Sequence, residues 1–266
     1  MNMKKILFFW VMMFPFYLAS GQNSAVAEKV SQSVYKIVVN QTVNVVAVID
    51  GDGVVLYDTG YNGAGEEIEA AVKTFTQLPI KTIYNTHHHG DHTGSNAYFA
   101  ERGVKIYATQ KTAAKLQSSG KIELWQLGDN MKEWSDAHSG SDVTVYMVEE
   151  KIAIVGDMLF EERFPYIDVA SGGDVTVYLE TQGEIISSLP DDVKIIGGHG
   201  RIYTLEEYET LNGLLWETYD KVKELVMADE SLDAIKKANP LGDYAHLEWG
   251  LVNKDKWIEI IYSSLR

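Results

Sequence analysis

Four of the seven histidines in this 266-residue chain lie within one octapeptide, HHHGDHTG. His87 and His89 are two positions apart, so on an extended segment their side chains point the same way. Gly90 lets the backbone turn sharply after them, which can bring Asp91 and His92 round to a second centre. Imidazole and carboxylate groups suit zinc, iron and manganese. The octapeptide therefore predicts a site for divalent metal.

Further candidate ligands are spread along the chain, each at the end of a predicted strand. His138 and His199 come just before or after such strands, and Asp157 ends the sequence Val-Gly-Asp. A lone histidine is more often a hydrogen-bonded structural residue, but a set gathered at strand ends beside aspartates favours metal binding. His88 should point away from the metals, and His246 has no place in the pattern.

The predicted elements that position these residues occur twice along the chain, each time in the order hairpin, Asp, helix, Leu-Pro, strand, His. The first copy consists of residues 43–57, Asp58, 65–77, 78–79, 80–84 and His87. The second consists of residues 143–155, Asp157, 174–188, 189–190, 193–196 and His199. Two sheets packed face to face, each with helices outside, would place both Asp and His ends along one rim. We therefore predict two pseudo-twofold halves; two unrelated α/β units with the same order are the alternative. Helices are expected to follow at residues 205–227 and 257–265.

These motifs resemble those of the metallo-β-lactamase superfamily, over about residues 43–200. The resemblance implies a four-layer αββα sandwich with two zinc ions, and iron or manganese stay open as alternatives. It assigns the metal ligands to two sets joined by a bridging carboxylate: His87, His89 and His138; Asp91, His92 and His199; and the bridge Asp157. Asp58 would support the ligands from behind. A metal-bound hydroxide would attack the substrate, with Asp91 as the catalytic residue that handles the proton.

The residues after Asp157 bear on the substrate. The commonest β-lactamases of the family carry Cys at this position and Lys three residues later, where this chain has Phe160. Lactonases of the family are similar in their bridging Asp but have Tyr in place of Phe160. The expected reaction is therefore hydrolysis of an ester, lactone or amide-type bond of a small molecule, β-lactams included. The side chains expected to line the pocket are Phe160, Phe164, Tyr166 and Trp125, with Arg163 as a candidate for a substrate carboxylate.

Two other classes of protein remain as alternatives. One is an iron-dependent sulfur dioxygenase or a flavodiiron-like redox protein on the same fold, and the other is a non-catalytic metal-binding module. The second would be favoured by missing ligands, and none is missing. The sequence contains no GxSxG, GxxxxGK[ST] or GxGxxG motif, which argues against serine hydrolases, P-loop proteins and dinucleotide-binding proteins.

The N-terminus predicts export. Lys4 and Lys5 precede an apolar run, and small residues follow at positions 19–21, as in a cleaved signal peptide. We expect residues 1–21 to be the signal peptide and 22–266 the hydrolase domain, periplasmic or secreted, without stable membrane association after cleavage; an uncleaved anchor is the alternative. The chain has no cysteine, so it cannot form disulfides. Its net charge of −15 disfavours binding to nucleic acid. The oligomeric state stays open.

Overall fold

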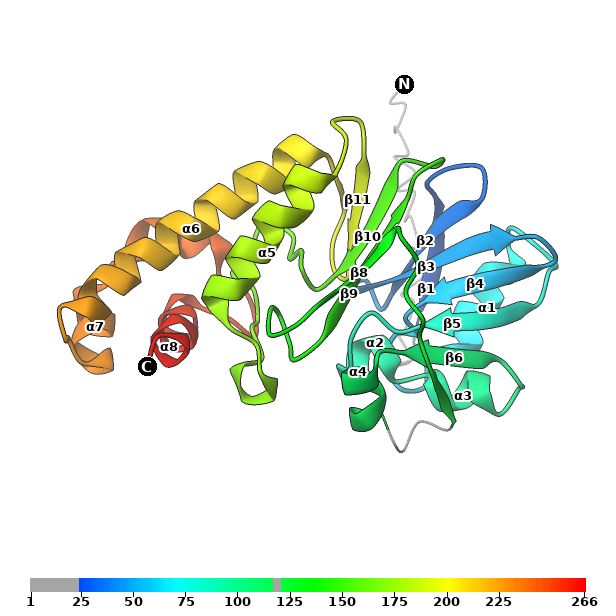
Figure 1. The fold of residues 1–266 in the computed structure, drawn as a ribbon, viewed down its shortest axis with the longest axis horizontal. Coiled ribbons are helices and arrows are strands. Elements are labelled where there is room, and N and C mark those ends of the chain that lie inside the picture. The colour runs from blue at the N-terminus through cyan, green and yellow to red at the C-terminus, as the bar shows by residue number, and fades with distance from the viewer. Residues whose placement is uncertain (1–23, 117–120) are drawn as a thin grey trace, which may run out of the picture.

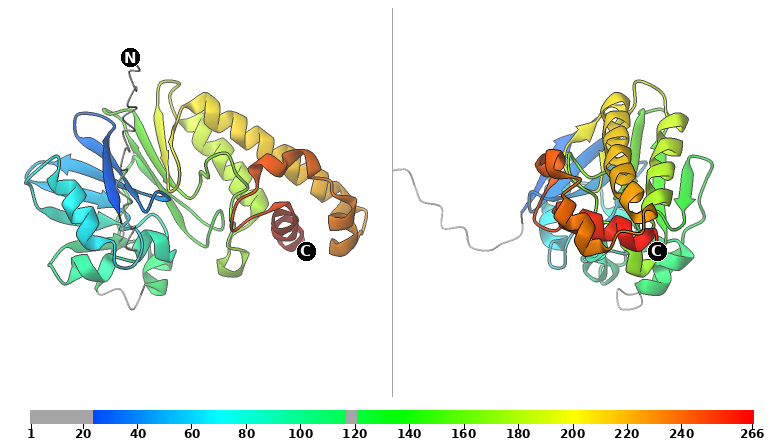
Figure 2. Two further views of the ribbon diagram at one scale, coloured as in Figure 1. Left: turned by 180° about the vertical axis from the view of Figure 1, so that it is seen from behind. Right: turned by 90° about the vertical axis from the view of Figure 1, so that its left-hand side faces the viewer.

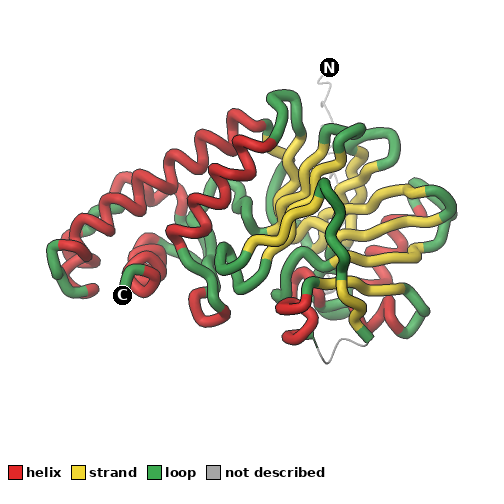
Figure 3. Tube along the Cα trace, viewed as in Figure 1, coloured by secondary structure: helices red, strands yellow, loops and turns green. Residues whose placement is uncertain are grey.

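The computed structural model describes residues 24–116 and 121–266, so the predicted signal peptide lies outside the described residues. Two β-sheets pack against each other between layers of helix (Figure 1 and Figure 3). The first sheet has seven strands in sequence order: β1 (Ala25–Lys29), β2 (Val34–Val39), β3 (Val43–Asp50), β4 (Gly53–Tyr57), β5 (Ile80–Tyr84), β6 (Lys105–Ala108) and β7 (Ile122–Leu124). The second has five, in the order β12 (Ile202–Tyr203), β11 (Lys194–Gly197), β10 (Ile152–Gly156), β9 (Asp142–Met147) and β8 (Met131–Trp134).

The predicted duplication is present in the strand pairing. In the first half β3 pairs antiparallel with β4, and β4 pairs parallel with β5. In the second half β9 pairs antiparallel with β10, and β10 pairs parallel with β11. Each half therefore has a hairpin followed by a crossover helix and a parallel strand, as the sequence predicts. The strands β1, β2, β6 to β8 and β12 were not predicted.

Helices cover the outer faces of both sheets. On the first sheet lie α1 (Gly65–Lys73) and α3 (Asn96–Ala100), and Figure 2 shows α1 over the outer face when the molecule is seen from behind. On the second lie α5 (Val175–Ser188), α6 (Leu205–Met227) and α8 (Lys254–Ser264). The shorter helices are α2 (Gly90–Thr93), α4 (Gln110–Lys115), α7 (Leu232–Ala238), η1 (Val169–Ser171) and η2 (Gly242–Leu247). Within the described part of the chain, no helix has both the length and the apolar character to cross a membrane.

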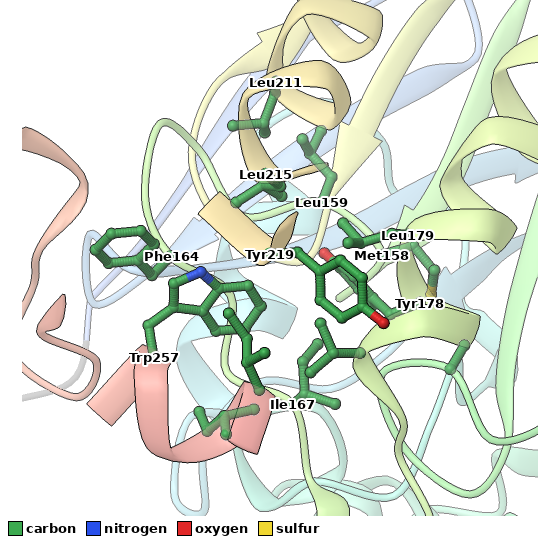
Figure 4. Close-up of a cluster of buried hydrophobic side chains, with 14 of the residues drawn as sticks. Met158, Leu159, Phe164, Ile167, Tyr178, Leu179, Leu211, Leu215, Tyr219 and Trp257 are labelled. Atoms are coloured by element: carbon green, nitrogen blue, oxygen red, sulfur yellow. The ribbon is translucent and has the colours of Figure 1, made fainter. Parts of the chain in front are cut away.

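Three apolar cores separate the layers, which makes the fold an αββα sandwich. Between the sheets, Val46 and Tyr57 from the first pack with Val145 and Ile154 from the second. Further cores lie under α1 and α3 and under α5, α6 and α8. Figure 4 shows the last of these cores. Each fully buried aliphatic or aromatic side chain stabilises the fold by about 1.5–3 kcal/mol, so the sheets form a rigid support.

The two halves are joined at one rim by backbone hydrogen bonds. Val143 N–H, at the start of β9, donates to the carbonyl of Thr86 just before the histidine cluster (2.9 Å). Reciprocally, Asn44 N–H in β3 donates to the carbonyl of Gly198 (2.8 Å), and Val43 forms a bridge with His199. Each half therefore holds the histidine loop of the other, which brings both sets of predicted ligands together.

Candidate metal centre

The octapeptide begins shortly after the end of β5, and its second half forms α2. His87 and His92 are fully buried, and their rings lie 4.3 Å apart between centroids. The turn depends on Gly94, because a Cβ there would lie 2.2 Å from the backbone nitrogen of Asn62 and 2.5 Å from the carbonyl oxygen of Gly90. Gly94 is therefore required by the close packing of the backbone, whereas the histidines and the aspartate of the motif are required by its chemistry.

Asp157 follows β10 and lies at the centre of the cluster, 4% exposed. Its Oδ2 is 3.7 Å from His87 Nε2, 3.6 Å from His138 Nε2 and 3.5 Å from His199 Nε2. Its Oδ1 is 3.2 Å from His92 Nε2. One carboxylate therefore faces imidazoles from both halves of the molecule.

The predicted ligands form two groups around this carboxylate. In each group one potential ligand atom per residue lies within 4.8 Å of all the others. The groups are His87, His89, His138 and Asp157, and Asp91, His92 and His199. In the second, His199 Nε2 lies 3.4 Å from Asp91 Oδ2. The structure thus brings together all seven residues that the sequence predicted as ligands.

Several atoms at this centre are buried without a hydrogen bond among the described residues. They are Nε2 of His87, His92 and His138 and Oδ1 of Asp157. Leaving such groups unpaired costs about 1–3 kcal/mol each, so a cluster of them marks a place for a ligand. Imidazole nitrogen and carboxylate oxygen are donors for divalent metals, and the residues present fit such ions.

The other ring nitrogen of each histidine is held by the chain. Asp58 Oδ2 accepts from His92 Nδ1 (2.8 Å), as expected of a supporting residue, and Asp142 Oδ1 accepts from His138 Nδ1 (2.9 Å). The remaining contacts are Thr86 Oγ1 with His87 Nδ1 (3.0 Å), Asp168 Oδ2 with His89 Nε2 (3.1 Å) and the carbonyl of Thr42 with His199 Nδ1 (2.8 Å). Such contacts fix the ring orientation and the tautomer of a ligand histidine.

Asp142 and Asp168 were missed by the sequence analysis. Asp142 lies four residues after His138 at the start of β9, a spacing that could have indicated it. Asp168 lies in the loop before η1, and its backbone N–H donates to the carbonyl of His138 (2.9 Å). Because it also contacts His89, this one residue connects two histidines of the first group.

The carboxylates set the charge state of the metal-free cluster. Burial lowers the pKa of His199, but the charge and hydrogen bond of Asp157 and the hydrogen bond to Asp91 outweigh it and raise this pKa to about 9. Burial raises the pKa of Asp91, yet the hydrogen bond from His199 and the charge of His92 bring it below its usual value. Asp91 is therefore an ionised carboxylate at neutral pH, at the open edge of the cluster.

Three of the side chains predicted to line the pocket, Phe160, Tyr166 and Arg163, lie near the metal centre. Phe160 stacks on His199, with 5.5 Å between ring centroids and 17° between ring planes. Tyr166 is 37% exposed and its ring lies 6.0 Å from that of His89. Arg163 lies over Trp249, 5.2 Å from the ring centroid, and Trp249 itself lies 6.1 Å from Phe160. Trp249 belongs to this wall and was not identified from the sequence.

Two of the aromatic predictions are wrong. Phe164 is fully buried and stacks on Trp257 in the helical core, as Figure 4 shows, with ring centroids 5.9 Å apart. Trp125 stacks on Tyr84 between the two sheets, with centroids 4.5 Å apart. Both side chains contribute to packing, because burial of a large aromatic surface stabilises a core more than any exposed position would.

Comparison with known proteins agrees with this geometry. The family model described as the metallo-beta-lactamase superfamily matches residues 39–116, which include the HxHxDH motif. The metallo-beta-lactamase IND-1 of Chryseobacterium indologenes is 34% identical over 70 residues. The segment that carries the HxHxDH motif therefore matches the metallo-beta-lactamase superfamily both as a family model and in a named relative.

The relatives are matched in part. A hydroxyacylglutathione hydrolase of Prochlorococcus marinus is 30% identical over 169 residues, which cover 60% of this chain and 64% of that protein. The match to IND-1 covers 26% of this chain and 29% of the relative. The chain thus spans less than two thirds of the length of either relative.

Solved structures of the superfamily share the fold. The metallo-β-lactamase FIM-1 of Pseudomonas aeruginosa, solved in a mono-zinc form, superposes with a TM-score of 0.63 at 17% identity. The match covers 73% of this chain and 96% of that one. A metallo-β-lactamase of Pontibacter korlensis gives a TM-score of 0.60 at 19% identity and covers the same 73% of this chain and 99% of its own. At this identity the likeness concerns the fold.

Proposed function

We propose that this protein is a metal-dependent hydrolase of small molecules that uses two divalent metal ions, most simply zinc. The observation that carries the proposal is the set of buried ring nitrogens and the carboxylate oxygen without hydrogen-bond partners around Asp157. His87, His89 and His138 would hold one ion, and Asp91, His92 and His199 the other. Asp157 would lie between them.

Bound zinc supplies a hydroxide near neutral pH by lowering the pKa of coordinated water to about 7. The chain's own residues provide the rest. Asp91 is ionised and partly exposed beside His199, so it is placed to take a proton at Oδ2 and return it to the leaving group. Asp58, Asp142 and Asp168 hold the rings of the histidines in place, which keeps their lone pairs aimed at the centre.

The proposed substrates carry an ester, lactone or amide-type bond, β-lactams included. Two relatives are named as a metallo-β-lactamase and a hydroxyacylglutathione hydrolase, which supports a hydrolytic reaction. Trp249 and Tyr166 beside the cluster supply apolar surface for the body of such a molecule, and Phe160, which is buried, supports them from behind. The experiment is a panel assay of zinc-loaded protein with a chromogenic cephalosporin, a homoserine lactone, aryl esters and a phosphodiester.

Removal and return of metal test the mechanism. We expect activity on at least one carboxylic ester, lactone or amide to disappear with a chelator and return with zinc. Elemental analysis of protein purified without added metal should give two ions per chain. Turnover that resists complete metal removal would overturn the proposal. One iron per chain without zinc would favour the iron-dependent dioxygenase alternative.

We also propose that the enzyme acts outside the cytoplasm. Support comes from Lys4 and Lys5 and the apolar run after them, which precede the first described strand. N-terminal sequencing of protein recovered from the periplasm or medium should find a start near residue 22. Full-length protein confined to the cytoplasm would contradict this.

A further inference from the structure

A pocket of about 350 Å³ lies beside the metal centre on the far side of His88. His88 is part of its lining, and the His88 ring lies 4.6 Å from the ring of His89 between centroids. The same pocket is lined by Lys111 and Lys115 of α4. The pocket and the cluster of proposed metal ligands therefore lie on the two sides of His88.

The two lysines differ in the contacts that their ammonium groups make with the protein. An ammonium has three N–H donors. Lys111 Nζ lies 3.2 Å from Ser135 Oγ, 3.1 Å from the carbonyl of Gly140 and 3.5 Å from Asp136 Oδ1, so its donors and its charge are satisfied.

Lys115 is exposed and has fewer partners within the protein. Its Nζ lies 3.4 Å from His88 Nε2 and 3.4 Å from the carbonyl of Ser171. Across residues 24–116 and 121–266, no carboxylate lies within 4.0 Å of this ammonium, and no third acceptor faces it. In a chain with a net charge of −15, an ammonium without an acidic partner at the edge of a metal cluster is the place where an anionic group can bind.

A third metal ion is the competing explanation for this region, because His88, His89 and Asp168 also lie close enough to hold one. Two contacts oppose it. The Lys115 ammonium points at His88 Nε2, where it would repel a cation, and His89 Nε2 already contacts Asp168 Oδ2 at 3.1 Å. The pocket lining also includes Asp136, but that carboxylate lies 3.5 Å from Lys111 Nζ, so the unpaired lining charge is the positive one of Lys115 and favours an anion.

We propose that this pocket binds a carboxylate carried by the substrate, with Lys115 as its positive partner and His88 as the wall between carboxylate and metal centre. The inference rests on the proposed hydrolase function and narrows it to small acids with a hydrolysable bond. One free donor and one unpaired charge match a singly charged group. The carboxylate of Asp168 lies 3.7 Å from His88 Nε2 and accepts from the backbone N–H of Ser171, but it does not lie within 4.0 Å of the Lys115 ammonium.

Binding of glutarate to the zinc-loaded protein tests the pocket without turnover, because under this proposal one carboxylate meets the metals and the other meets Lys115. By calorimetry, Lys115→Met should raise the Kd of glutarate about tenfold, the loss of one charge-assisted hydrogen bond. Lys115→Arg should restore most of the affinity. Lys111→Met removes the same charge from the same pocket and should change Kd less than about twofold, because that ammonium is already paired. Absent binding in the parent, an unchanged Kd in Lys115→Met, or equal losses in both Met variants would each overturn the proposal.

Kinetics separate this inference from the proposed function. The para-nitrophenyl monoester of glutaric acid should lose about tenfold in kcat/KM in Lys115→Met, mostly through KM, while the neutral para-nitrophenyl valerate should not change. If neither ester is hydrolysed by any variant, the failure concerns the reaction, and the glutarate Kd still decides the pocket. A third metal ion gained by Lys115→Met would show a cation site and refute the anion pocket.

Discussion

The two halves of the molecule place an aspartate at the same point and use it differently. Asp58 follows β4, where its Oδ1 accepts from Thr86 N–H (2.8 Å) and its Oδ2 from the Thr86 hydroxyl (2.8 Å) and His92 Nδ1 (2.8 Å). Asp157 follows β10, and four imidazole Nε2 atoms surround its oxygens at 3.2–3.7 Å. The lone pairs of Asp58 are occupied by protein donors, whereas those of Asp157 are available to a metal.

The backbone explains how equivalent positions diverge. In the first half Asp58 itself has a positive φ, +66°. In the second half the positive φ, +51°, belongs to Gly156, one residue before the aspartate, and a Cβ there would lie 2.9 Å from Thr86 Oγ1. The two carboxylates therefore leave their turns in different directions. A repeated sequence order gives a repeated scaffold, while the neighbours of each side chain decide its chemistry.

The largest expected effect comes from Asp157→Asn, which keeps the shape of the side chain and removes its charge. Since changes behind the ligands typically cost about 10–100-fold, loss of a shared ligand should lower kcat/KM by at least about 100-fold. Elemental analysis should find fewer than two metals per chain. Asp192→Asn, at an exposed carboxylate paired with Lys151, is the control and should behave as the parent. Two metals and near-parental turnover in Asp157→Asn would contradict the assignment of Asp157 as a shared metal ligand.

Asp58→Asn should have a smaller effect. The amide still offers an acceptor but loses the charge that favours the oriented His92 ring, so metal affinity should fall about 10–100-fold. Turnover at saturating metal should fall less. Chelator competition measures the affinity, and Asp192→Asn, at an exposed carboxylate far from these contacts in sequence, is again the control and should bind metal as the parent does. A loss of metal as complete as that of Asp157→Asn would mean that Asp58 is itself a ligand.

Much of the scaffold could be predicted because its signals are local. β5 and α6 begin and end where the sequence predicted, since the apolar periodicity is clear and Thr204 with Glu207 forms a capping box before α6. The metal ligands were found for a similar reason. Histidine is rare in this chain, and its position after a strand is visible in the sequence.

The residues that support the ligands carry no such signal. The chain has 38 acidic residues, and nothing marks Asp168 until folding brings it to His89, 79 positions away. Trp249 reaches Phe160 because hydrogen bonds with Phe164 hold the segment around the end of η2 against the loop after β10. Phe164 and Trp125 show the reverse error, because apolar character is the same in a core and in a pocket wall.

Asp168→Asn tests how the second half supports a ligand of the first. The variant weakens the contact to His89 Nε2 and keeps the backbone hydrogen bond to His138, so metal affinity should fall about tenfold. Glu259→Gln, on the neighbouring α8, is a control that alters an exposed carboxylate paired with lysines. Chelator competition and thermal unfolding of the metal-free variant together separate weaker metal binding from a general loss of stability. Affinity equal to that of the parent would show that the His89 ring needs no partner.

The smallest expected effect concerns His87 and His199, which end equivalent strands and titrate in opposite directions. Burial, and then the nearby His92, lowers the pKa of His87 well below 6.5. Burial also lowers that of His199, but Asp157 and Asp91 raise it to about 9. A raised histidine pKa contributes stability that is fully present below the unfolded value of 6.5 and is lost as pH rises through about 9.

The metal-free protein should therefore lose thermal stability between about pH 6.5 and pH 9. His199→Gln should reduce this loss, whereas His87→Gln should leave it in place, because His87 is neutral throughout the range. Melting curves across this range for the parent and both variants check the prediction. Zinc-loaded protein should show a flatter profile, since a metal would replace the proton on His199. The same slope in all three metal-free proteins would mean that the carboxylate of Asp157 does not distinguish the two histidines.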